Sequence, residues 1–561
     1  MQKSMCIAGS LLAGLLLSGA SYAQGFLKAA GTRIVNERNE NVLLRGMGLG
    51  GWMLQEGYML RVPGPGQQHT IRQRIQELIG PESTQAFYDA WLANHTRRED
   101  IDSLKAWGFN AVRLPMHYNL YTLPVEKEPV PGQNTWLKKG FALTDSLLAW
   151  CKANRMYLIL DLHAAPGGQG NDLNISDRDT SQPALWESRA RQEKTIALWR
   201  KLAARYRNEP WIGAYDLLNE PNWGFQDPVN DPNGTREKQN APLKKLLQEI
   251  TAAIREVDKK HIIIIEGNGW GNNYNGILPP WDNNMVLSFH KYWNFNDEAS
   301  IRHILNARTK YNVPVWLGET GENSNVWFTA AIRLLESHNI GWSWWPLKKL
   351  GAGNPLEIPL NSRYQQILDY WAGKGPKPPE AAARSGIMQL AADARTGNNI
   401  LHRDVIDAMM RQPFDPTARP YLPNRIAGNT TLQAVNYDLG PNGVAYFDLD
   451  SANYRVVNPK LRGGNRGRTY RNDGADIRKE GEGYIITHFE SGEWLQYTLQ
   501  VAQAGRYAIT LVPAPANAQV SLWMDGKKVA GEVTLNTGRH ILRVQVDDGT
   551  STLREITLRK K

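Results

Sequence analysis

Cysteine is nearly absent from this chain, whose 561 residues include only Cys6 and Cys151. Cys6 lies in an N-terminal segment that we expect to be removed, which leaves Cys151 without a partner for an internal disulfide. Long hydrophobic runs are also lacking, because the apolar stretch Ile7–Leu17 is too short to cross a bilayer. The sequence therefore excludes a disulfide scaffold and predicts no membrane-spanning helix.

A concentrated basic surface is missing as well, although the net charge is +10. Acidic residues are scattered among the basic ones, apart from a local basic cluster at Lys460–Arg471. Nucleic-acid binding needs a basic face or stripe. We therefore expect no nucleic-acid partner and interpret the charges as a solvated surface.

The first 23 residues have the pattern of a secretory signal peptide. Lys3 supplies the positive start, Ile7–Leu17 the apolar run, and Ser21-Tyr22-Ala23 a cleavage site before Gln24. We therefore predict a secreted or periplasmic bacterial protein that does not contact the membrane once the signal is removed.

Aromatic residues are plentiful, with 20 Trp and 21 Tyr. Large flat side chains stack well on sugar faces, although most of them belong to hydrophobic cores. A chain of this length predicts two or three domains.

Residues 24–375 alternate short apolar runs with amphipathic stretches, which indicates repeated β-α units. Eight such strands with interleaved helices predict an α/β fold, a closed (β/α)8 TIM barrel. The expected strands are Val42–Gly50, Asn110–Met116, Tyr157–His163, Gly213–Glu220, Ile262–Gly269, Val286–Tyr292, Pro314–Thr320 and Ile340–Leu347. The expected helices are Ser83–Trp107, Phe141–Ala153, Arg189–Arg207, Pro242–Asp258, Glu298–Tyr311, Asn325–His338 and Ser362–Trp371.

Polar side chains collect where these strands end, and four long connections follow the same ends. In such barrels the functional site lies at the carboxyl ends of the strands. We therefore expect the connections to wall a substrate cleft; they are Glu56–Gln68, Leu120–Trp136, Ala164–Gln182 and Asn222–Gln239.

The pattern changes after the barrel. Residues 376–423 predict a helical extension with a helix near Leu401–Arg411, followed by a proline-rich linker. Residues 424–561 show the alternation of β-strands with turns between them, which predicts an all-β sandwich.

Two glutamates end the fourth and seventh expected strands, Glu220 and Glu319. Residues at these positions meet across the barrel mouth, so their carboxyl groups can approach to about 5 Å, the spacing of retaining glycosidases. One carboxyl group would protonate the leaving oxygen while the other attacks the sugar. The pair therefore predicts hydrolysis of a glycosidic bond by double displacement.

Motifs at successive strand ends strengthen this interpretation. They are Asn219-Glu220-Pro221, Gly108-Phe109-Asn110-Ala111-Val112-Arg113-Leu114-Pro115, Leu160-Asp161-Leu162-His163, Ser288-Phe289-His290-Lys291-Tyr292 and Trp344-Trp345-Pro346. In this order, and with Glu319 ending the seventh strand, the chain resembles the retaining glycoside hydrolases of family 5, the cellulase family of clan A. The resemblance covers about residues 26–375.

The resemblance implies a role for each matching residue. Glu220 would be the acid/base and Glu319 the nucleophile, with Arg113 bonding the nucleophile and holding it ionised. Asn219 would bond the sugar 2-hydroxyl. The −1 subsite would be shaped by His163, His290, Tyr292 and Trp345, with Trp345 as its floor.

Four further acids lie near these motifs. We expect Glu266 and Glu322 to have subsite or structural roles, and Asp161 and Asp216 to lie deeper in the barrel. Ligand spacing for a metal on one element is lacking, so we expect no metal and no cofactor at the site.

The loop His163-Ala164-Ala165-Pro166-Gly167-Gly168-Gln169 resembles that of exo-1,3-glucanase-like members more than that of the endoglucanases. This likeness favours a β-glucan substrate and leaves the choice between β-1,3 and β-1,4 linkages open.

The C-terminal part resembles a family 6-like carbohydrate-binding module. The residues that carry the likeness are Ala434–Asp438, Gly443–Tyr446, Tyr470–Ile477 and Gly492–Thr498. Such modules can keep an enzyme near an insoluble glycan. Gln433 stands where they often carry a glutamate near a structural calcium, which argues against calcium. Because the tail Ser551–Ile556 lacks the Trp and Asn that often complete a binding cleft, a purely structural module stays an alternative.

We therefore predict an exported, monomeric, retaining β-glucanase that acts on a polysaccharide or oligosaccharide. A β-mannanase or a transglycosylase could use the same residues. An inactive glycan-binding protein is the alternative from another class, although a pure binder has no use for Glu220, Glu319 and Arg113 together. The sequence leaves endo and exo action open.

Overall fold

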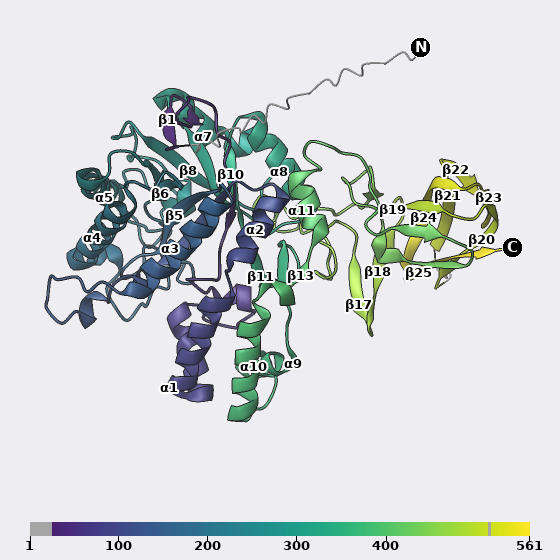
Figure 1. The fold of residues 1–561 in the computed structure, drawn as a ribbon, viewed down its shortest axis with the longest axis horizontal. Helices are drawn as coiled ribbons and strands as arrows, with labels where there is room; N and C mark the ends of the chain where they lie inside the picture. Colours follow the sequence, from purple (N-terminus) through teal and green to yellow (C-terminus); the bar gives the residue numbers. More distant parts are fainter. Residues whose placement is uncertain (1–24, 514–517) are drawn as a thin grey trace, which may run out of the picture.

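The computed structural model describes residues 25–513 and 518–561, so the expected signal peptide lies outside the described residues. Figure 1 shows a larger α/β part and a smaller sheet-rich part side by side. None of the helices within the described ranges has both the length and the apolarity needed to span a membrane.

Eight parallel strands close into a barrel in the order β10-β3-β4-β5-β6-β7-β8-β9, which confirms the predicted fold class. Their residues are almost all buried, since side chains fill the barrel interior on one face and helices cover the other. The strands are β3 (Arg45–Gly48), β4 (Ala111–His117), β5 (Tyr157–Ala164), β6 (Ile212–Asp216), β7 (Ile262–Glu266), β8 (Met285–Lys291), β9 (Val315–Gly321) and β10 (Gly341–Trp345).

Helices alternate with these strands as expected, with differences in two connections. A short helix at Asn268–Gly271 was not predicted, and the first connection differs as well. The sequence predicts a single helix over Ser83–Trp107, whereas the structure has a longer α1 (Gln68–Asn94) and a separate α2 (Arg98–Trp107). Arg97 is extended, and its N–H donates to Asp100 Oδ2 over 2.8 Å, which starts a new helix there. The remaining barrel helices are α3 (Lys138–Ala153), α4 (Arg189–Tyr206), α5 (Ala241–Val257), α6 (Asn268–Gly271), α7 (Glu298–Tyr311), α8 (Asn325–Ser337) and α9 (Ser362–Trp371).

The segment after the barrel is helical in two places, α10 (Glu380–Asp393) and α11 (Arg403–Met410). Helix α10 lies beside α1 and α9, where the three share a hydrophobic cluster (Figure 1). Helix α11 packs on α8, so this segment belongs to the body of the protein.

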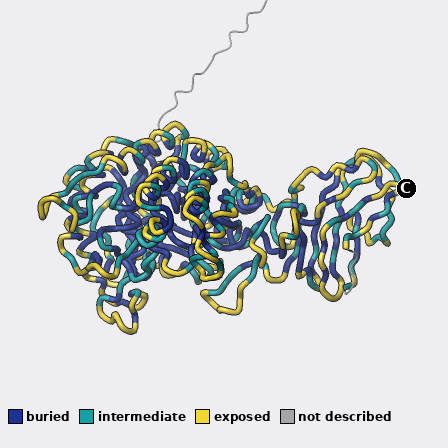
Figure 2. Tube along the Cα trace, turned by 90° about the horizontal axis from the view of Figure 1, so that it is seen from below, coloured by how far each residue is buried: buried dark blue, intermediate teal, exposed yellow. Residues whose placement is uncertain are grey.

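The C-terminal part contains two antiparallel-rich sheets that share one hydrophobic core. Figure 2 shows this core as a band of buried chain separate from the barrel interior. One sheet contains β14 (Asn424–Ile426), β16 (Tyr446–Phe447), β17 (Ile477–Glu480), β18 (Gly483–Glu490), β19 (Trp494–Val501), β21 (Ala518–Met524), β22 (Lys527–Val529) and β24 (Gly538–Leu553). The other contains β15 (Thr430–Gln433), β20 (Gly505–Val512), β23 (Glu532–Leu535) and β25 (Glu555–Lys560).

A buried hydrogen-bond network joins this C-terminal part to the barrel. The Asn325 amide group at the start of α8 donates to Asp404 Oδ2 over 2.8 Å and to Asp473 Oδ1 over 2.9 Å. The Asn325 N–H also donates to the Asn472 carbonyl oxygen over 2.8 Å. Because buried polar groups are costly to separate from their partners, the network fixes the C-terminal part on the barrel.

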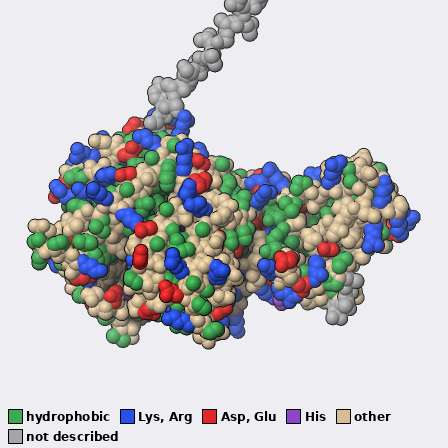
Figure 3. Space-filling view, turned by 60° about the horizontal axis from the view of Figure 1, so that its bottom comes forward, with side chains coloured by type: hydrophobic (Ala, Val, Ile, Leu, Met, Phe, Trp, Pro, Cys, Tyr) green, Lys and Arg blue, Asp and Glu red, His purple; other side chains and the backbone are tan. Residues whose placement is uncertain are grey.

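Charges of both signs are mixed over the face of the molecule seen in Figure 3. No large surface of one sign is visible on that face, which agrees with the interpretation of a solvated surface.

Candidate active site

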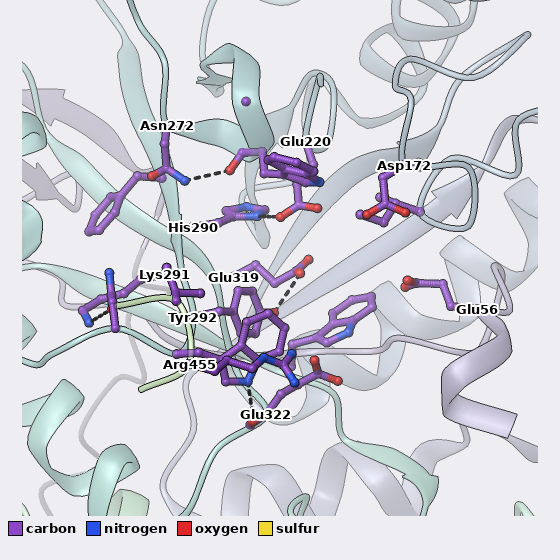
Figure 4. A pocket seen from close by; sticks show the side chains of 18 of the residues that line it. Glu56, Asp172, Glu220, Asn272, His290, Lys291, Tyr292, Glu319, Glu322 and Arg455 are labelled. Atoms are coloured by element: carbon purple, nitrogen blue, oxygen red, sulfur yellow. Dashed lines mark hydrogen bonds and ion pairs between the residues drawn. The ribbon is translucent and has the colours of Figure 1, made fainter. Parts of the chain in front are cut away.

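A cavity of about 790 Å³ opens at the carboxyl ends of the barrel strands. Figure 4 shows Glu220 and Glu319 pointing into it from opposite walls. Six of the residues predicted for the site line this cavity: His163, Glu220, His290, Tyr292, Glu319 and Trp345. The other two, Arg113 and Asn219, are completely buried beneath it.

The two glutamates meet as the sequence predicts. One carboxylate oxygen of Glu220 and one of Glu319 lie within 4.8 Å of each other. Both residues are buried. This separation is shorter than the about 6.5–9.5 Å that inverting enzymes leave for a water.

Glu319 receives one hydrogen bond on each carboxylate oxygen. Arg113 Nη1 donates to Oε2 over 3.0 Å, and the Tyr292 hydroxyl donates to Oε1 over 2.8 Å. The strand register brings His290 level with Glu319, after a bulge between Phe289 and His290. These two donors, one of them a guanidinium, favour the ionised, oriented carboxylate that a nucleophile needs.

Glu220 lies in a strained turn four residues beyond the end of β6. Its φ of 44° is in the left-handed region, which costs about 1–3 kcal/mol for such a residue. The Glu220 N–H donates to Glu266 Oε2 over 2.7 Å, and Asn222 Nδ2 donates to the Glu220 carbonyl over 2.8 Å. These bonds stabilise the turn, so Glu266 is a positioning residue for Glu220.

His290 connects Glu220 with Glu266. Its Nδ1 lies 2.6 Å from Glu220 Oε1, and its Nε2 lies 3.1 Å from Glu266 Oε1. Burial alone would lower the pKa of His290, but the two carboxylates raise this pKa well above the ordinary value. His290 is therefore a buried cation at neutral pH.

The two glutamates differ in their neighbours although burial raises the pKa of both. The His290 cation opposes that rise for each of them. Arg113 further opposes it for Glu319, while Glu266 and Asp172 add to it for Glu220. These neighbours favour protonation of Glu220 over protonation of Glu319, which is the difference that an acid and a nucleophile would need.

Arg113 also binds the deeper acids of the barrel. Its Nε and Nη2 donate to Asp216 Oδ2, and its Nη1 lies 3.2 Å from Asp161 Oδ2. Burial raises the pKa of both Asp161 and Asp216 well above the ordinary value. Both acids are completely buried, as expected for the barrel interior.

His163 and Trp345 lie side by side in the cavity wall. Their rings are nearly parallel, with centroids 5.1 Å apart. The Trp345 ring fits because Gly48 and Gly50 face it; a Cβ atom at either glycine would lie within 2.7 Å of the indole. Trp345 Nε1 donates to the Tyr58 hydroxyl over 2.8 Å, which fixes the ring in its plane.

Asn219 makes its contacts beneath the cavity floor. Its Oδ1 accepts from Arg113 Nη2 over 2.8 Å, and its Nδ2 lies 3.3 Å from His163 Nε2. A bond from Asn219 to a sugar hydroxyl, as the family resemblance implies, stays a prediction.

Several lining residues were not predicted from the sequence. Two of the four long connections contribute them: Glu56 and Tyr58 from the first, Asp172 and Asn174 from the third. Within the described part of the chain, the other two connections do not line this cavity. Burial, followed by the charge of Glu319, raises the pKa of Glu56 well above the ordinary value, so Glu56 would offer a carboxylic acid to a ligand. The only signal in the sequence for these lining residues was that they are polar or aromatic and lie in long loops at the strand ends.

The cavity is also lined by Trp270, Trp293, Glu322, Arg455 and Val456. Arg455 and Val456 come from the C-terminal part, more than 100 residues beyond β10.

Among the described residues, Glu220, His290 and Glu319 form the one group whose donor atoms could surround a metal ion. Both nitrogens of the His290 ring already face carboxylates, and a protonated ring has no free lone pair for a metal. The group therefore fits an acid/base network better than a metal site, and the expected absence of a cofactor stays a prediction.

The comparison with known families agrees with this geometry. The sequence model of the cellulase family, glycosyl hydrolase family 5, matches residues 73–351. The barrel is a glycosyl hydrolase family 5 domain. The protein is therefore a glycosidase, and the family predicted from the strand-end motifs is confirmed.

Curated relatives of the family 5 domain carry several activities in their names. A β-xylosidase of Phanerodontia chrysosporium is 28% identical over 387 residues, which cover 62% of this chain and 76% of the relative. Endoglucanase C of Acetivibrio thermocellus is 31% identical over 216 residues, covering 38% and 55%. A probable glucan 1,3-β-glucosidase A of Aspergillus clavatus is 25% identical over 284 residues, covering 49% and 61%. The chain thus spans little more than half of the last two.

Among solved structures, rutinosidase from Aspergillus niger is similar with a TM-score of 0.44 and 17% identity. The match covers 56% of this chain and 93% of the rutinosidase.

Replacing His290 by asparagine should move both limbs of the pH profile of kcat/KM to higher pH. The His290 cation lowers the pKa of Glu220 and of Glu319 against the effect of burial, so its loss raises both. The acidic limb reports the group that must be ionised and the basic limb the group that must be protonated. Initial rates from pH 3 to 10 would measure the shift.

His303→Asn is a matched control, because His303 lines the same cavity but its pKa is shifted in the opposite direction, below the ordinary value. We expect this variant to keep both limbs in place. Limbs that stay in place in His290→Asn would contradict a cationic His290.

Proposed function

We propose that this protein is an exported, monomeric, retaining glycosidase that hydrolyses β-glucosidic bonds of a β-glucan without a metal ion. The observation that carries the proposal is the carboxylate pair, with oxygens of Glu220 and Glu319 within 4.8 Å of each other. The relatives named endoglucanase and glucan 1,3-β-glucosidase support a β-glucan.

In the first step Glu319 attacks the anomeric carbon while Glu220 gives its proton to the glycosidic oxygen. A covalent glycosyl-enzyme forms and the leaving sugar departs with that proton. The Tyr292 hydroxyl and Arg113 hold the attacking carboxylate in place.

In the second step Glu220, now ionised, takes a proton from water. The water oxygen attacks the anomeric carbon and releases Glu319 as a carboxylate. Esterification has removed the charge of Glu319, which lowers the pKa of Glu220 and suits it to act as a base. The sugar leaves with its original β configuration.

A β-xyloside is the second candidate substrate. The match to the β-xylosidase spans more of both chains than the matches to the endoglucanase and the glucosidase. Xylose is glucose without its exocyclic CH2OH group, so one cavity can accept either backbone when nothing fills the space of that group.

A substrate panel tests the proposal. We expect hydrolysis of laminarin, lichenan, cellulose, pustulan or xylan, with the β anomer of the product appearing first in proton NMR spectra. Release of the α anomer first would exclude double displacement. Activity on mannan alone would exclude both substrate candidates.

A further inference from the structure

A long loop of the C-terminal part reaches the mouth of the barrel. This loop, residues 448–472, lies between β16 and β17, and we name it the cleft loop. Asn323 Nδ2 of the barrel donates to the Asn453 carbonyl over 2.7 Å, and the Asn453 N–H donates back to Asn323 Oδ1 over 3.0 Å. The cleft loop is therefore held at the active site by paired hydrogen bonds.

Two further contacts set the position of the next residues. The Val456 N–H donates to the Trp293 carbonyl over 3.2 Å, and the rings of Tyr454 and Phe295 lie 4.9 Å apart. Arg455 lies between Tyr454 and Val456, so both of its chain neighbours are fixed on the barrel. This places the Arg455 side chain in the cavity (Figure 4).

The Arg455 guanidinium lies over the Trp293 ring, with its Cζ atom 3.7 Å from the ring centroid. Within residues 25–513 and 518–561, the guanidinium has no protein hydrogen-bond acceptor. The nearby acid Glu322 is engaged, since its Oε1 lies 3.3 Å from Lys349 Nζ. The donors of Arg455 are therefore free for a ligand.

The surroundings of Arg455 suit a sugar. Tyr58, whose side chain is 44% exposed, lines the main cavity and an adjoining cavity of about 250 Å³. Trp293, Glu322 and Arg455 line the same two cavities. The exposed Tyr58 ring and the free donors of Arg455 provide the stacking face and the hydrogen bonds that a sugar residue needs.

Tyr58, Trp293 and Arg455 lie next to the carboxyl group of Glu319. The Tyr58 hydroxyl accepts from Trp345, and Trp293 follows Tyr292, whose hydroxyl bonds Glu319. In the view of Figure 4, Arg455 and Glu322 lie on the side of Glu319 that faces away from Glu220.

We infer that the cleft loop forms a second sugar subsite of the family 5 domain, in which Arg455 donates to the hydroxyl oxygens of the sugar next to the one at Glu319. The C-terminal part is then a wall of the catalytic cleft, rather than a glycan-binding module that acts apart from it. This inference rests on the proposed function.

Arg455→Ala in the full chain tests the inference. We expect kcat/KM for tri- and tetrasaccharides to fall about tenfold, as for the loss of a hydrogen bond from a charged donor, mainly through KM. For an aryl glycoside of a single sugar, which does not reach Arg455, we expect a change of less than about twofold. Oligosaccharide binding to Glu319→Gln, with and without Arg455→Ala, would measure the affinity separately from turnover.

Lys460→Ala is the matched control. It removes the same charge from the same loop, but Lys460 is exposed and does not line either cavity. Suppose that the wild-type protein cleaves these substrates and that Arg455→Ala and Lys460→Ala have equal kcat/KM. This result would overturn the subsite but not the proposed function. An equal loss on all substrate lengths would also overturn the subsite. A wild type that cleaves no β-glucoside or β-xyloside would overturn the proposed function as well.

Discussion

Glu319→Ala should lower kcat by at least about 10⁴-fold, the scale expected when a covalent nucleophile is removed. The small cavity left by the carboxylate can admit azide, which then attacks the anomeric carbon in its place. With an activated aryl β-glycoside, azide should restore turnover and yield the α-glycosyl azide. Release of the aryl group and NMR of the product would measure both.

Folding of the variant must be checked, because Glu319 is hydrogen-bonded to Arg113 and Tyr292. An unchanged circular dichroism spectrum would show that the barrel persists. A folded Glu319→Ala variant with wild-type activity would exclude Glu319 as the nucleophile.

Glu220→Ala should show a loss that depends on the leaving group. A general acid contributes about 10²–10⁴-fold, and we expect kcat/KM for oligosaccharides to fall by about that factor. A dinitrophenyl glycoside needs no proton to depart, so its kcat/KM should change by less than about tenfold. Stopped-flow measurement of dinitrophenolate should then show a burst, because hydrolysis of the glycosyl-enzyme becomes slow.

Reaction of Glu220→Ala with azide provides a control for the assignment of the two roles. Azide should speed the second step of Glu220→Ala and yield the β-glycosyl azide, the opposite anomer from that of Glu319→Ala. The same anomer from both variants would contradict the assignment of the two roles. Equal losses on oligosaccharides and on the dinitrophenyl glycoside would exclude Glu220 as the acid.

The barrel could be predicted because its strands are buried on both faces. Such strands appear as continuous apolar runs, as in Ile262–Glu266, and each run ends where a loop begins. The boundary between α1 and α2 was missed because a side chain of the second helix, Asp100, starts that helix without a glycine or a proline between them.

The meeting of Glu220 and Glu319 could also be predicted, since position at a strand end determines where a residue lies in a closed barrel. Glu56 and Tyr58 could not, because loop residues reach the cavity through the path of the loop rather than through a repeating pattern. Glu266 was noted as an acid near the mouth. The hydrogen bond from the Glu220 N–H to Glu266 depends on the left-handed backbone conformation of Glu220. A glutamate in the sequence does not by itself indicate that conformation.

Arg455 could not be predicted from a local pattern, because it lies on a loop between β16 and β17, more than 100 residues beyond the last barrel strand. The basic cluster at Lys460–Arg471 was visible in the sequence as an unexplained feature near it. The place of Arg455 beside the barrel depends on side-chain hydrogen bonds from Asn323 and Asn325, which lie more than a hundred residues earlier in the chain.

The bonds from Asn325 to Asp404 and Asp473 have a consequence for how such enzymes diversify. A recombination event that exchanged residues 424–561 for another domain would also replace part of the surface that selects the substrate. Exchange of the C-terminal part alone would therefore leave the Asn325 amide group without its partner Asp473. A chimaera built by cutting between the barrel and the C-terminal part should be planned around the residues at their junction, not around the boundary of the fold.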